Sequence, residues 1–363
     1  LGREPNDWDI CTSAAPEQTE ACFAADRTVL TGARYGTVTV VRGGVPYEIT
    51  TFRAEAGYAD SRHPDRVDFL RELAPDLARR DFTVNAMAMD ARGRLTDLFG
   101  GRDDLELLLI DEDKRKDTEE RRKFLNAADL VFLCLPDEAA REAVAMIDNP
   151  NTRVIDASTA HRTAPGWDYG FPELSPHHRA RIVCSKRVAN PGCHASGFIA
   201  SVYPLVQLGL IPPDHPLCAY SLTGYSGGGK KLIAEYQDPH RDPRHASARI
   251  YGTNLHHKHL PEMVHVCGLA APPVFHPILG DYIQGMATTV LLRNDTLPGR
   301  PTAQEIHQAL SSYYAGQTFV SVAPFGGDEP VIYSDTLVGT NQLRLIVCGH
   351  EAQTTVTALF DNL

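Results

Sequence analysis

The sequence lacks the long apolar runs, paired cysteines and internal repeats that define several protein classes. No apolar stretch approaches the roughly 20 residues that cross a bilayer. The longest run, around Leu130–Leu135, is expected to form a buried strand. The eight cysteines include no C-x-x-C pair, which favours reduced thiols over a disulfide framework. These absences exclude a membrane partner and a disulfide scaffold, and we expect a cytoplasmic globular protein.

Lysine is absent before Lys114, although arginine is frequent there, and this asymmetry favours two origins within one chain. The net charge of −11 excludes a global attraction to nucleic acid. A length of 363 residues predicts two or three domains. Leu1 is not an initiator and no signal-peptide pattern follows it, so we expect a chain truncated at its N-terminus.

Patterns of strand and helix alternate after residue 105. The expected elements are the strand Leu105–Ile110, the helix Glu119–Ala127, the strand Leu130–Leu135, the helix Asp137–Ile147 and the strand Arg153–Asp156. This alternation predicts a parallel, doubly wound sheet. Further on, Tyr282–Arg293 and Thr318–Val322 are rich in strand formers and predict a second domain with an antiparallel sheet.

The first 105 residues have a different pattern. Tyr35–Val41 and Val45–Phe52 are rich in strand formers and are separated by a glycine turn, which predicts a hairpin. Pro75–Met89 contains a helical run, and Thr96–Gly101 is expected to be an exit loop.

One cysteine stands in a pattern typical of a reactive thiol. Cys193 follows Pro191–Gly192, a tight turn, and precedes Ala195–Leu210, which is apolar enough for a buried helix. The positive end of a helix dipole stabilises a thiolate at that position. The alternative is a small buried hydrophobic residue, the usual role of a free cysteine.

Three other segments carry groups suited to an anionic ligand. Asp156–Arg162 follows a predicted strand, where open α/β sheets bind ligands, and Arg162 can clamp a phosphate or carboxylate. Ser221–Lys231 is a loop of glycines and hydroxyls that ends in two lysines; the alternative is a flexible surface loop. His256–Glu262 gathers three imidazoles without a standard zinc spacing, so an acid/base histidine is favoured over a metal site, with solvated loop histidines as the alternative.

Together with Tyr169–Leu174, these segments resemble the short-type N-acetyl-γ-glutamyl-phosphate reductases, from about Gly101 to the C-terminus. The resemblance implies an NADP-binding Rossmann domain and an α+β catalytic domain of the glyceraldehyde-phosphate-dehydrogenase type. It implies that Cys193 attacks the acyl phosphate, that phosphate leaves, and that NADPH reduces the thioester to N-acetylglutamate 5-semialdehyde in arginine biosynthesis. His259, with His257 as its competitor, would move the proton.

The same resemblance implies further site residues and a homo-oligomer. Substrate contacts would come from Arg162, Ser158 and Asn190. Cofactor contacts would come from Arg115, Lys116, Leu135, Pro136, Gly227 and Gly228. The strand and glycine-rich turn that meet the NADP pyrophosphate in this family are missing upstream of Leu105. We therefore expect weakened cofactor binding and apolar surface exposed on the neighbouring strands.

The N-terminal third carries a second set of candidate residues. Asp7 and Asp9 would share one face of a strand, as paired magnesium ligands must, and Glu48 can supply a third carboxylate. A solvated loop is the alternative for this short motif. Arg80 can reach a phosphate, and Asp81 a ribose.

With Tyr58–Pro64, residues 1–105 resemble the head domain of CCA-adding tRNA nucleotidyltransferases and poly(A) polymerases. The resemblance implies that Asp7, Asp9 and Glu48 hold Mg²⁺ and that Arg80 and Asp81 contact the incoming nucleotide. The base-selecting helix and the tRNA-binding body do not follow, so tRNA is a partner by resemblance alone.

Gly101–Glu106 fits both families, which favours two coding sequences joined at this segment. The expected fold is α/β and α+β, in four parts: a partial nucleotidyltransferase palm (1–105), a truncated Rossmann domain (106–192), a catalytic and dimerisation domain (193–345), and a C-terminal segment (346–363) that returns to the Rossmann domain. The predicted function is the acyl-phosphate reduction. The alternatives are tRNA nucleotidyl transfer or a catalytically impaired chimera.

Overall fold

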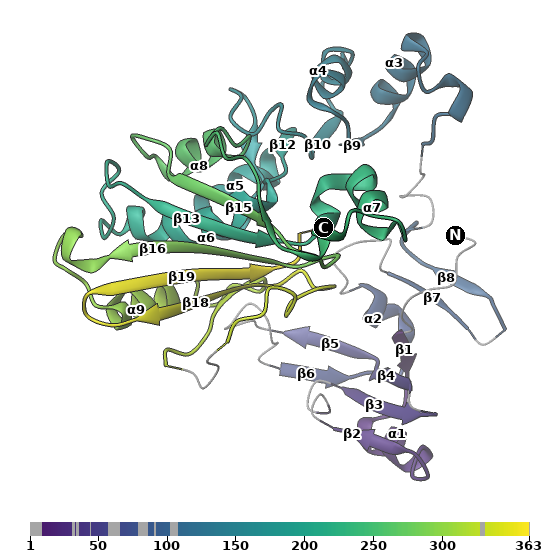
Figure 1. The fold of residues 1–363 in the computed structure, drawn as a ribbon. Coiled ribbons are helices and arrows are strands. Elements are labelled where there is room, and N and C mark those ends of the chain that lie inside the picture. The colour runs from purple at the N-terminus through teal and green to yellow at the C-terminus, as the bar shows by residue number, and fades with distance from the viewer. Residues whose placement is uncertain are drawn as a thin grey trace. The chain divides into compact units, whose positions relative to one another are not determined.

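The structure, a computed structural model, divides into two compact units, Leu1–Leu108 and Leu109–Leu363 (Figure 1). The described residues are 9–30, 33, 36–43, 45–56, 66–78, 86–90, 92–101, 108–326 and 331–362. Asp7, Arg80 and Asp81 lie outside them, as does the side chain of Asp9.

The first unit contains a four-stranded sheet in the order β1-β4-β3-β2. Its strands are β1 (Asp9–Thr12), β2 (Arg27–Val29), β3 (Thr37–Arg42) and β4 (Val45–Thr51), with helix α1 (Pro16–Cys22) between β1 and β2. The predicted hairpin is confirmed, because β3 and β4 pair in antiparallel fashion. Inward-facing Val38, Val40 and Ile49 form a small core with Phe23.

Two small hairpin-like pairs complete the first unit: β5 (Arg53–Ala56) with β6 (Arg66–Phe69), and β7 (Met87–Met89) with β8 (Leu95–Asp97). The helix predicted within Pro75–Met89 is found as α2 (Leu73–Ala78). The helix ends at Ala78, and residues 87–89 at the other end of the predicted segment form the strand β7. The methionines favour a helix by propensity, but pairing with β8 overrides that preference. The predicted exit loop likewise begins within β8.

The second unit begins with a parallel sheet in the order β11-β12-β10-β9. Its elements are α3 (Thr118–Ala127), β9 (Leu130–Leu133), α4 (Asp137–Ala145), β10 (Arg153–Asp156), β11 (Asp168–Tyr169), α5 (Pro176–Cys184) and β12 (Arg187–Ala189). The predicted alternation of strand and helix is therefore confirmed. Val131, Leu133, Ala143 and Val154 form its core.

Strand β9 stands at one edge of this parallel sheet. The strand predicted at Leu105–Ile110 is not found: residues 108–110 have no regular structure, and 105–107 lie outside the described residues. The expected buried strand is found as β9, but it is buried on one face only: Val131 and Leu133 are buried, whereas Leu130 is 45% exposed and Phe132 66% exposed. Parallel strands are normally covered on both faces, and within the described residues of the second unit one face of β9 has no such cover.

A seven-stranded mixed sheet follows, in the order β14-β15-β13-β16-β19-β18-β17. Its strands are β13 (Cys218–Thr223), β14 (Arg249–Ile250), β15 (Val274–Leu279), β16 (Met286–Arg293), β17 (Val320–Val322), β18 (Leu343–Gly349) and β19 (Gln353–Phe360). The central strands are antiparallel, as predicted. The predicted return of 346–363 to the Rossmann domain is wrong, because β19 pairs with β16 and β18 near the middle of this sheet.

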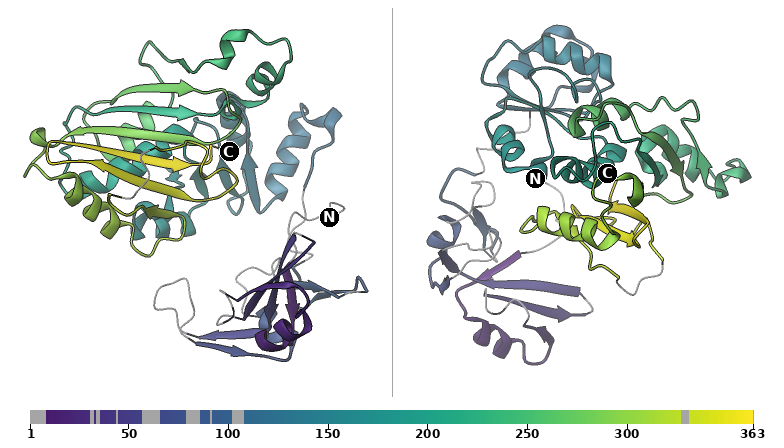
Figure 2. Two further views of the ribbon diagram at one scale, coloured as in Figure 1. Left: turned by 60° about the horizontal axis from the view of Figure 1, so that its bottom comes forward. Right: turned by 90° about the vertical axis from the view of Figure 1, so that its left-hand side faces the viewer.

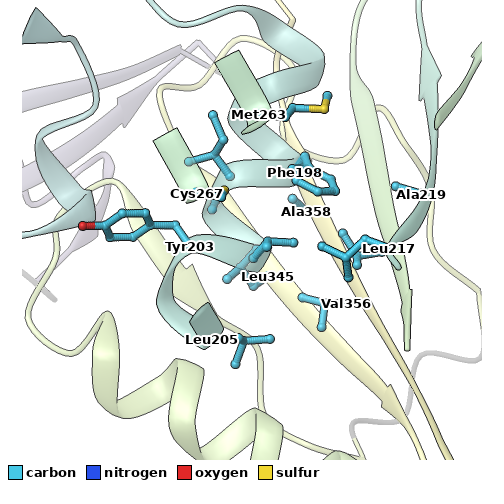
Figure 3. Packing of buried hydrophobic residues seen from close by; sticks show 14 of the residues in the cluster. Phe198, Tyr203, Leu205, Leu217, Ala219, Met263, Cys267, Leu345, Val356 and Ala358 are labelled. Carbon is cyan, nitrogen blue, oxygen red and sulfur yellow. The ribbon is translucent and has the colours of Figure 1, made fainter. Parts of the chain in front are cut away.

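Helices α6 (Cys193–Gln207) and α9 (Ala303–Tyr313) pack together on one face of the seven-stranded sheet, with α8 (Leu260–Cys267) against α6 (Figures 1 and 2). Helix α7 (Gly229–Gln237) follows β13. Figure 3 shows the resulting core, in which Phe198 and Leu205 of α6 meet Met263 of α8 and Leu345 and Val356 of the sheet. This packing fixes α6, and with it the helix start at Cys193. None of the helices in the described ranges combines the length and apolar character of a bilayer-spanning segment.

Candidate active site

A cavity of about 1030 Å³ lies in the second unit. Leu133, Asp156 and Ala189 share one row across β9, β10 and β12, so the carboxyl ends of these strands meet at a single edge. The loops leaving this edge contribute to the cavity, together with the segment before α8 and the loop after β13. Of the predicted site residues, the cavity brings together Arg162, Asn190, Cys193, Gly227, Gly228, His257 and His259.

Cys193 is the first residue of α6, two residues earlier than the predicted helix start. Gly192 before it has an extended backbone, with φ −75° and ψ 142°, so the helix begins at the thiol. Burial raises the pKa of the Cys193 thiol, whereas the His194 backbone N–H and the charges of Arg162 and Lys258 lower it. Burial is the largest of these effects and the pKa lies above its ordinary value. The expected stabilisation of the thiolate at the helix N-terminus is therefore present but outweighed.

Alkylation of Cys193 by iodoacetamide is expected to accelerate as the pH rises past about 9, because the thiolate is the nucleophile and a raised pKa keeps the thiol protonated to higher pH. Peptide mass spectrometry across a pH series gives the rate for each cysteine. Exposed Cys348 serves as the internal reference. A Cys193 profile that levels off at lower pH than that of Cys348 contradicts the prediction.

Two histidines flank Lys258 at the entrance to α8. His259 is the N-cap of α8 and is buried, and its Nδ1 has no hydrogen-bond partner among the described residues. Burial is the main cause that lowers the pKa of His259 well below its usual range, followed by electrostatic interactions with His194 and with the charge of Arg162. Burial and Lys258 lower the pKa of His257 to about 4. Both imidazoles are therefore neutral at neutral pH.

The position of His259 favours it over His257 as the ring beside the thiol. A Cβ placed on Gly192, the residue before Cys193, would lie 2.7 Å from Nε2 of His259. His257 Nδ1 accepts a hydrogen bond from the His259 backbone N–H at 3.2 Å, which fixes the turn between the two rings. Their roles in proton transfer stay predictions.

A buried hydrogen-bond chain that the sequence did not reveal runs through His194. Its Nδ1 lies 2.9 Å from Ser221 Oγ, and its Nε2 lies 2.7 Å from the Tyr251 hydroxyl. Ser221 Oγ in turn lies 2.7 Å from Thr288 Oγ1. Burial is the main cause that lowers the pKa of His194 to about 3, and burial together with Cys193 raises the pKa of Tyr251. This chain holds the Tyr251 hydroxyl near the thiol.

Glu262, for which the sequence predicts no role, is the centre of a second network. Its Oε1 accepts from Arg162 Nη1 at 2.9 Å. Its Oε2 accepts from the Tyr169 hydroxyl at 2.9 Å and from the Gly192 backbone N–H at 3.1 Å. Burial raises the pKa of Glu262, and Arg162 opposes that shift. The three-residue spacing from His259, one turn along a helix, was the available signal.

Arg162 is 8% exposed and bonds mainly to the protein. Besides Glu262, it donates from Nε to the Asn190 carbonyl at 2.9 Å and from Nη2 to the Ala157 carbonyl at 3.0 Å. It therefore ties together the loops that follow β10 and β12. A guanidinium has five N–H donors, and the described residues accept hydrogen bonds from three of those of Arg162.

Ser158 is not among the residues that line the cavity. It is buried, and its hydroxyl donates to Asp156 Oδ2 at 2.7 Å. The same oxygen lies 2.6 Å from His161 Nδ1, and His161 stacks on Trp167. Ser158 thus stabilises the loop that carries Arg162. Asn190 is exposed and does line the cavity.

The predicted cofactor residues fall into two groups. Gly227 and Gly228 line the cavity that holds the thiol. Arg115, Lys116, Leu135 and Pro136 do not line it. The sequence between 108 and 192 holds no glycine-rich turn for a pyrophosphate. The N-terminus of α3 is closed by its own Asp117, which accepts from the Glu119 and Glu120 N–H groups.

The lysines that end the predicted anion loop, Lys230 and Lys231, are exposed and absent from the cavity lining. In the first unit, the parallel register of β1 and β4 sets Asp9 opposite Glu48. The described part of the chain contains no cluster of three or more metal-ligating side chains, but Asp7 is not in that part. The predicted magnesium set stays a prediction.

Gly192→Ala is expected to slow alkylation of Cys193, because the added methyl group forces the backbone before the thiol, or the side chains around it, to move. The added Cβ would lie closer than 3 Å to Arg162 Nη1, Glu262 Oε1 and His259 Nε2. Alkylation kinetics and thermal unfolding measure the effect. An alkylation rate within about threefold of the unmodified chain would show that the three side chains move aside at little cost.

Three family models match the chain in succession. The Poly A polymerase head domain matches residues 1–111, the semialdehyde dehydrogenase NAD binding domain matches 102–182, and the semialdehyde dehydrogenase dimerisation domain matches 193–362. The first two matches overlap at 102–111, around the segment that fits both families. The NAD binding domain match supports a nicotinamide cofactor.

The chain is also similar to named proteins over its larger part. It is 44% identical over 273 residues to N-acetyl-gamma-glutamyl-phosphate reductase 2 of Nostoc sp., a match covering 72% of this chain and 85% of that protein. It is 46% identical over 271 residues to N-acetyl-gamma-glutamyl-phosphate reductase of Chelativorans sp., covering 73% and 87%.

Solved structures give the fold of the same part. Aspartate semialdehyde dehydrogenase from Francisella tularensis has a TM-score of 0.52 at 12% identity, covering 66% of this chain and 79% of that one. Aspartate semialdehyde dehydrogenase II from Vibrio cholerae has a TM-score of 0.53 at 13% identity, covering 66% and 75%. These similarities confirm the predicted fold class for the second unit.

Proposed function

The chain belongs to the N-acetyl-γ-glutamyl-phosphate reductase family, and on that basis we propose that it reduces N-acetylglutamyl 5-phosphate to N-acetylglutamate 5-semialdehyde with NADPH, in arginine biosynthesis. The observation that supports this most is the position of Cys193. It begins a buried helix at the wall of a large cavity, with a neutral imidazole and a buried Arg162–Glu262 pair beside it.

The chemistry follows from the state of the thiol. Because its pKa is raised, Cys193 is protonated at neutral pH and needs a base when it attacks. Neutral His259 can take that proton, and an anionic substrate raises its basicity. The sulfur then bonds to the acyl carbon and phosphate leaves with the electrons of the broken C–O bond. When bound, NADPH supplies the hydride that reduces the resulting thioester.

The other residues position these groups. Glu262 holds the Gly192 N–H and Arg162, so it sets the backbone just before the nucleophile. Arg162 and Asn190 would contact the substrate. His257 supports His259 from the preceding turn, and Ser158 supports the Arg162 loop.

NADP in preference to NAD is part of this proposal. Gly227 and Gly228 would meet the nicotinamide half. Leu135 and Pro136, which follow β9, would border the path of the dinucleotide, and Arg115 and Lys116 would meet the 2′-phosphate. The test is phosphate-dependent reduction of NADP by the intact chain with N-acetylglutamate 5-semialdehyde. If phosphate causes no reduction above the enzyme-free rate, the chain lacks this activity.

We also propose a homo-oligomer formed through the sheet face opposite α6. Val274, Cys218 and Leu291 lie in one row across β15, β13 and β16. All three are exposed, Val274 by 49% and Leu291 by 43%. A row of apolar side chains on an open sheet face suits a symmetric contact with a second copy.

A second candidate function belongs to the first unit. Its match to the Poly A polymerase head domain and the register that sets Asp9 opposite Glu48 support nucleotidyl transfer with Mg²⁺ and tRNA. The assay is Mg²⁺-dependent incorporation of CTP or ATP into tRNA, compared with Asp7→Ala. Equal incorporation by both chains, or none by either, rejects this function.

A further inference from the structure

Lys258 differs from the other cationic side chains of the cavity. The arginines that line the cavity are Arg162 and Arg249, and both face carboxylates: Arg162 Nη1 lies 2.9 Å from Glu262 Oε1, and Arg249 Nη1 lies 3.6 Å from Glu235 Oε1. Lys258 lines the same cavity and is exposed. No ion pair within 4 Å involves it among the described residues, so its charge is available to a ligand.

The backbone around Lys258 is held firmly. The His259 N–H donates to His257 Nδ1 at 3.2 Å, and the Leu260 N–H donates to the His257 carbonyl at 3.0 Å. The two flanking imidazole rings meet edge to face at 4.8 Å between centroids. A flexible ammonium thus projects from a fixed turn into the cavity that contains the thiol.

The charge of Lys258 acts on the groups around the thiol. It lowers the pKa of Cys193, His194, His257 and His259, and it also lowers the pKa of Asp137 at the start of α4. The ammonium therefore lies in electrostatic range of the nucleophile, the imidazole cluster and the neighbouring helix. The imidazoles in this cluster are neutral, which leaves Lys258 as the cavity cation that no carboxylate pairs with in the described residues.

We propose that Lys258 is the anchor of a phosphate subsite, which binds the phosphoryl group of the acyl phosphate and the free phosphate it becomes. This inference rests on the proposed function. A lysine binds phosphate as a compact point charge, and Lys258 would hold the leaving dianion while the Cys193–acyl bond forms and the acyl C–O bond breaks. The thiol proton passes to His259. In the reverse direction phosphate attacks the thioester and the thiolate leaves, next to the same ammonium.

The test uses inorganic phosphate and the full chain, without cofactor. Phosphate is expected to protect Cys193 from iodoacetamide at constant ionic strength. In Lys258→Met, the phosphate concentration that halves the alkylation rate should rise about tenfold or more, the usual effect of losing a charged hydrogen bond. Each variant is compared with its own phosphate-free rate, because loss of the ammonium also slows alkylation.

Two controls separate charge at this site from general effects. Lys123→Met, on α3 and away from the cavity lining, should keep the protection of the unmodified chain. Lys258→Arg should keep most of the protection by phosphate, because arginine keeps the positive charge although its guanidinium differs in shape from the ammonium. Circular dichroism and thermal unfolding confirm that the Lys258 variants fold.

A dinucleotide also carries phosphates, so a parallel series replaces phosphate with NADP. If Lys258→Met weakens protection by NADP and leaves protection by phosphate unchanged, the lysine serves the dinucleotide and the proposal is overturned. Equal phosphate protection in the unmodified chain and in Lys258→Met overturns it as well, as does no phosphate protection in either. Lysine-dependent protection in a chain that reduces no NADP would instead uphold the phosphate subsite and reject the proposed function.

Discussion

Cys193→Ser is expected to reduce phosphate-dependent NADP reduction by at least about a thousandfold, and to abolish the acylated form of the chain. A serine hydroxyl is a far weaker acid than a thiol. The nearby base is also weak, since burial and its positive neighbours hold the pKa of His259 low. The variant therefore keeps the cavity and loses the group that attacks.

Two measurements check this prediction. Steady-state turnover gives the loss in rate, and mass spectrometry after mixing with N-acetylglutamyl 5-phosphate shows whether the acyl group is attached to the chain. Cys184→Ser, at the exposed end of α5, is the matched control and should retain its rate. A Cys193→Ser rate above about one hundredth of the control's would mean that another group carries the reaction.

Glu262→Ala is expected to lower the free energy of unfolding of the second unit by about 3–5 kcal/mol, the range found when one partner of a buried ion pair is removed. The truncation leaves the Arg162 guanidinium, 8% exposed, without its carboxylate. It also removes the acceptor for the Gly192 N–H and for the Tyr169 hydroxyl. Reactivity of Cys193 should fall as well, because Gly192 precedes it.

Urea unfolding followed by tryptophan fluorescence measures this effect. The chain has two tryptophans, Trp8 and Trp167. A Trp8→Phe background leaves Trp167, which stacks on His161 within the second unit, as the reporter. Tyr169→Phe is the graded control, since it removes one hydrogen bond and should cost about 1 kcal/mol. If Glu262→Ala lowers the free energy of unfolding by no more than Tyr169→Phe does, the Glu262 carboxylate is not the centre of the network.

The nucleophile and its helix could be predicted because their signals are local. Pro191 and Gly192 interrupt regular structure, and a long apolar segment follows, so the helix start and the thiol were evident within twenty or so residues. The pKa of the thiol could not be predicted from the local sequence. It depends on how deeply the fold buries Cys193, and burial outweighs the helix N-terminus.

The hydrogen-bond networks around Glu262 and His194 could not be predicted from the sequence, because they also depend on the fold. Glu262 is 70 residues from Gly192 and 100 from Arg162 along the chain, and only the packing of α8 against α6 brings it to the nucleophile. His194 was visible beside Cys193, but its partners Ser221 and Tyr251 come from distant segments. The spacing of residues along one helix or strand predicts contacts within that element. It does not predict contacts between residues that are distant in the sequence.

The fold prediction failed where one segment depended on a missing neighbour. Leu105–Ile110 has the composition of a buried strand, yet residues 108–110 form none. A parallel strand is stabilised by the strands beside it and the helices over it, not by its own propensity. Residues 108–110 belong to no strand of the parallel sheet, in which β9 is the edge strand.

The exposed apolar face of β9 affects how much of the chain folds correctly in a cell. Phe132 and Leu130 present apolar area next to a strand edge that no described strand of the second unit occupies. Such edges pair readily with other extended chains, and chains that expose them during folding aggregate as their concentration rises. The amount of functional protein would therefore be limited by how quickly this strand is shielded after synthesis, and the yield would fall as expression increases.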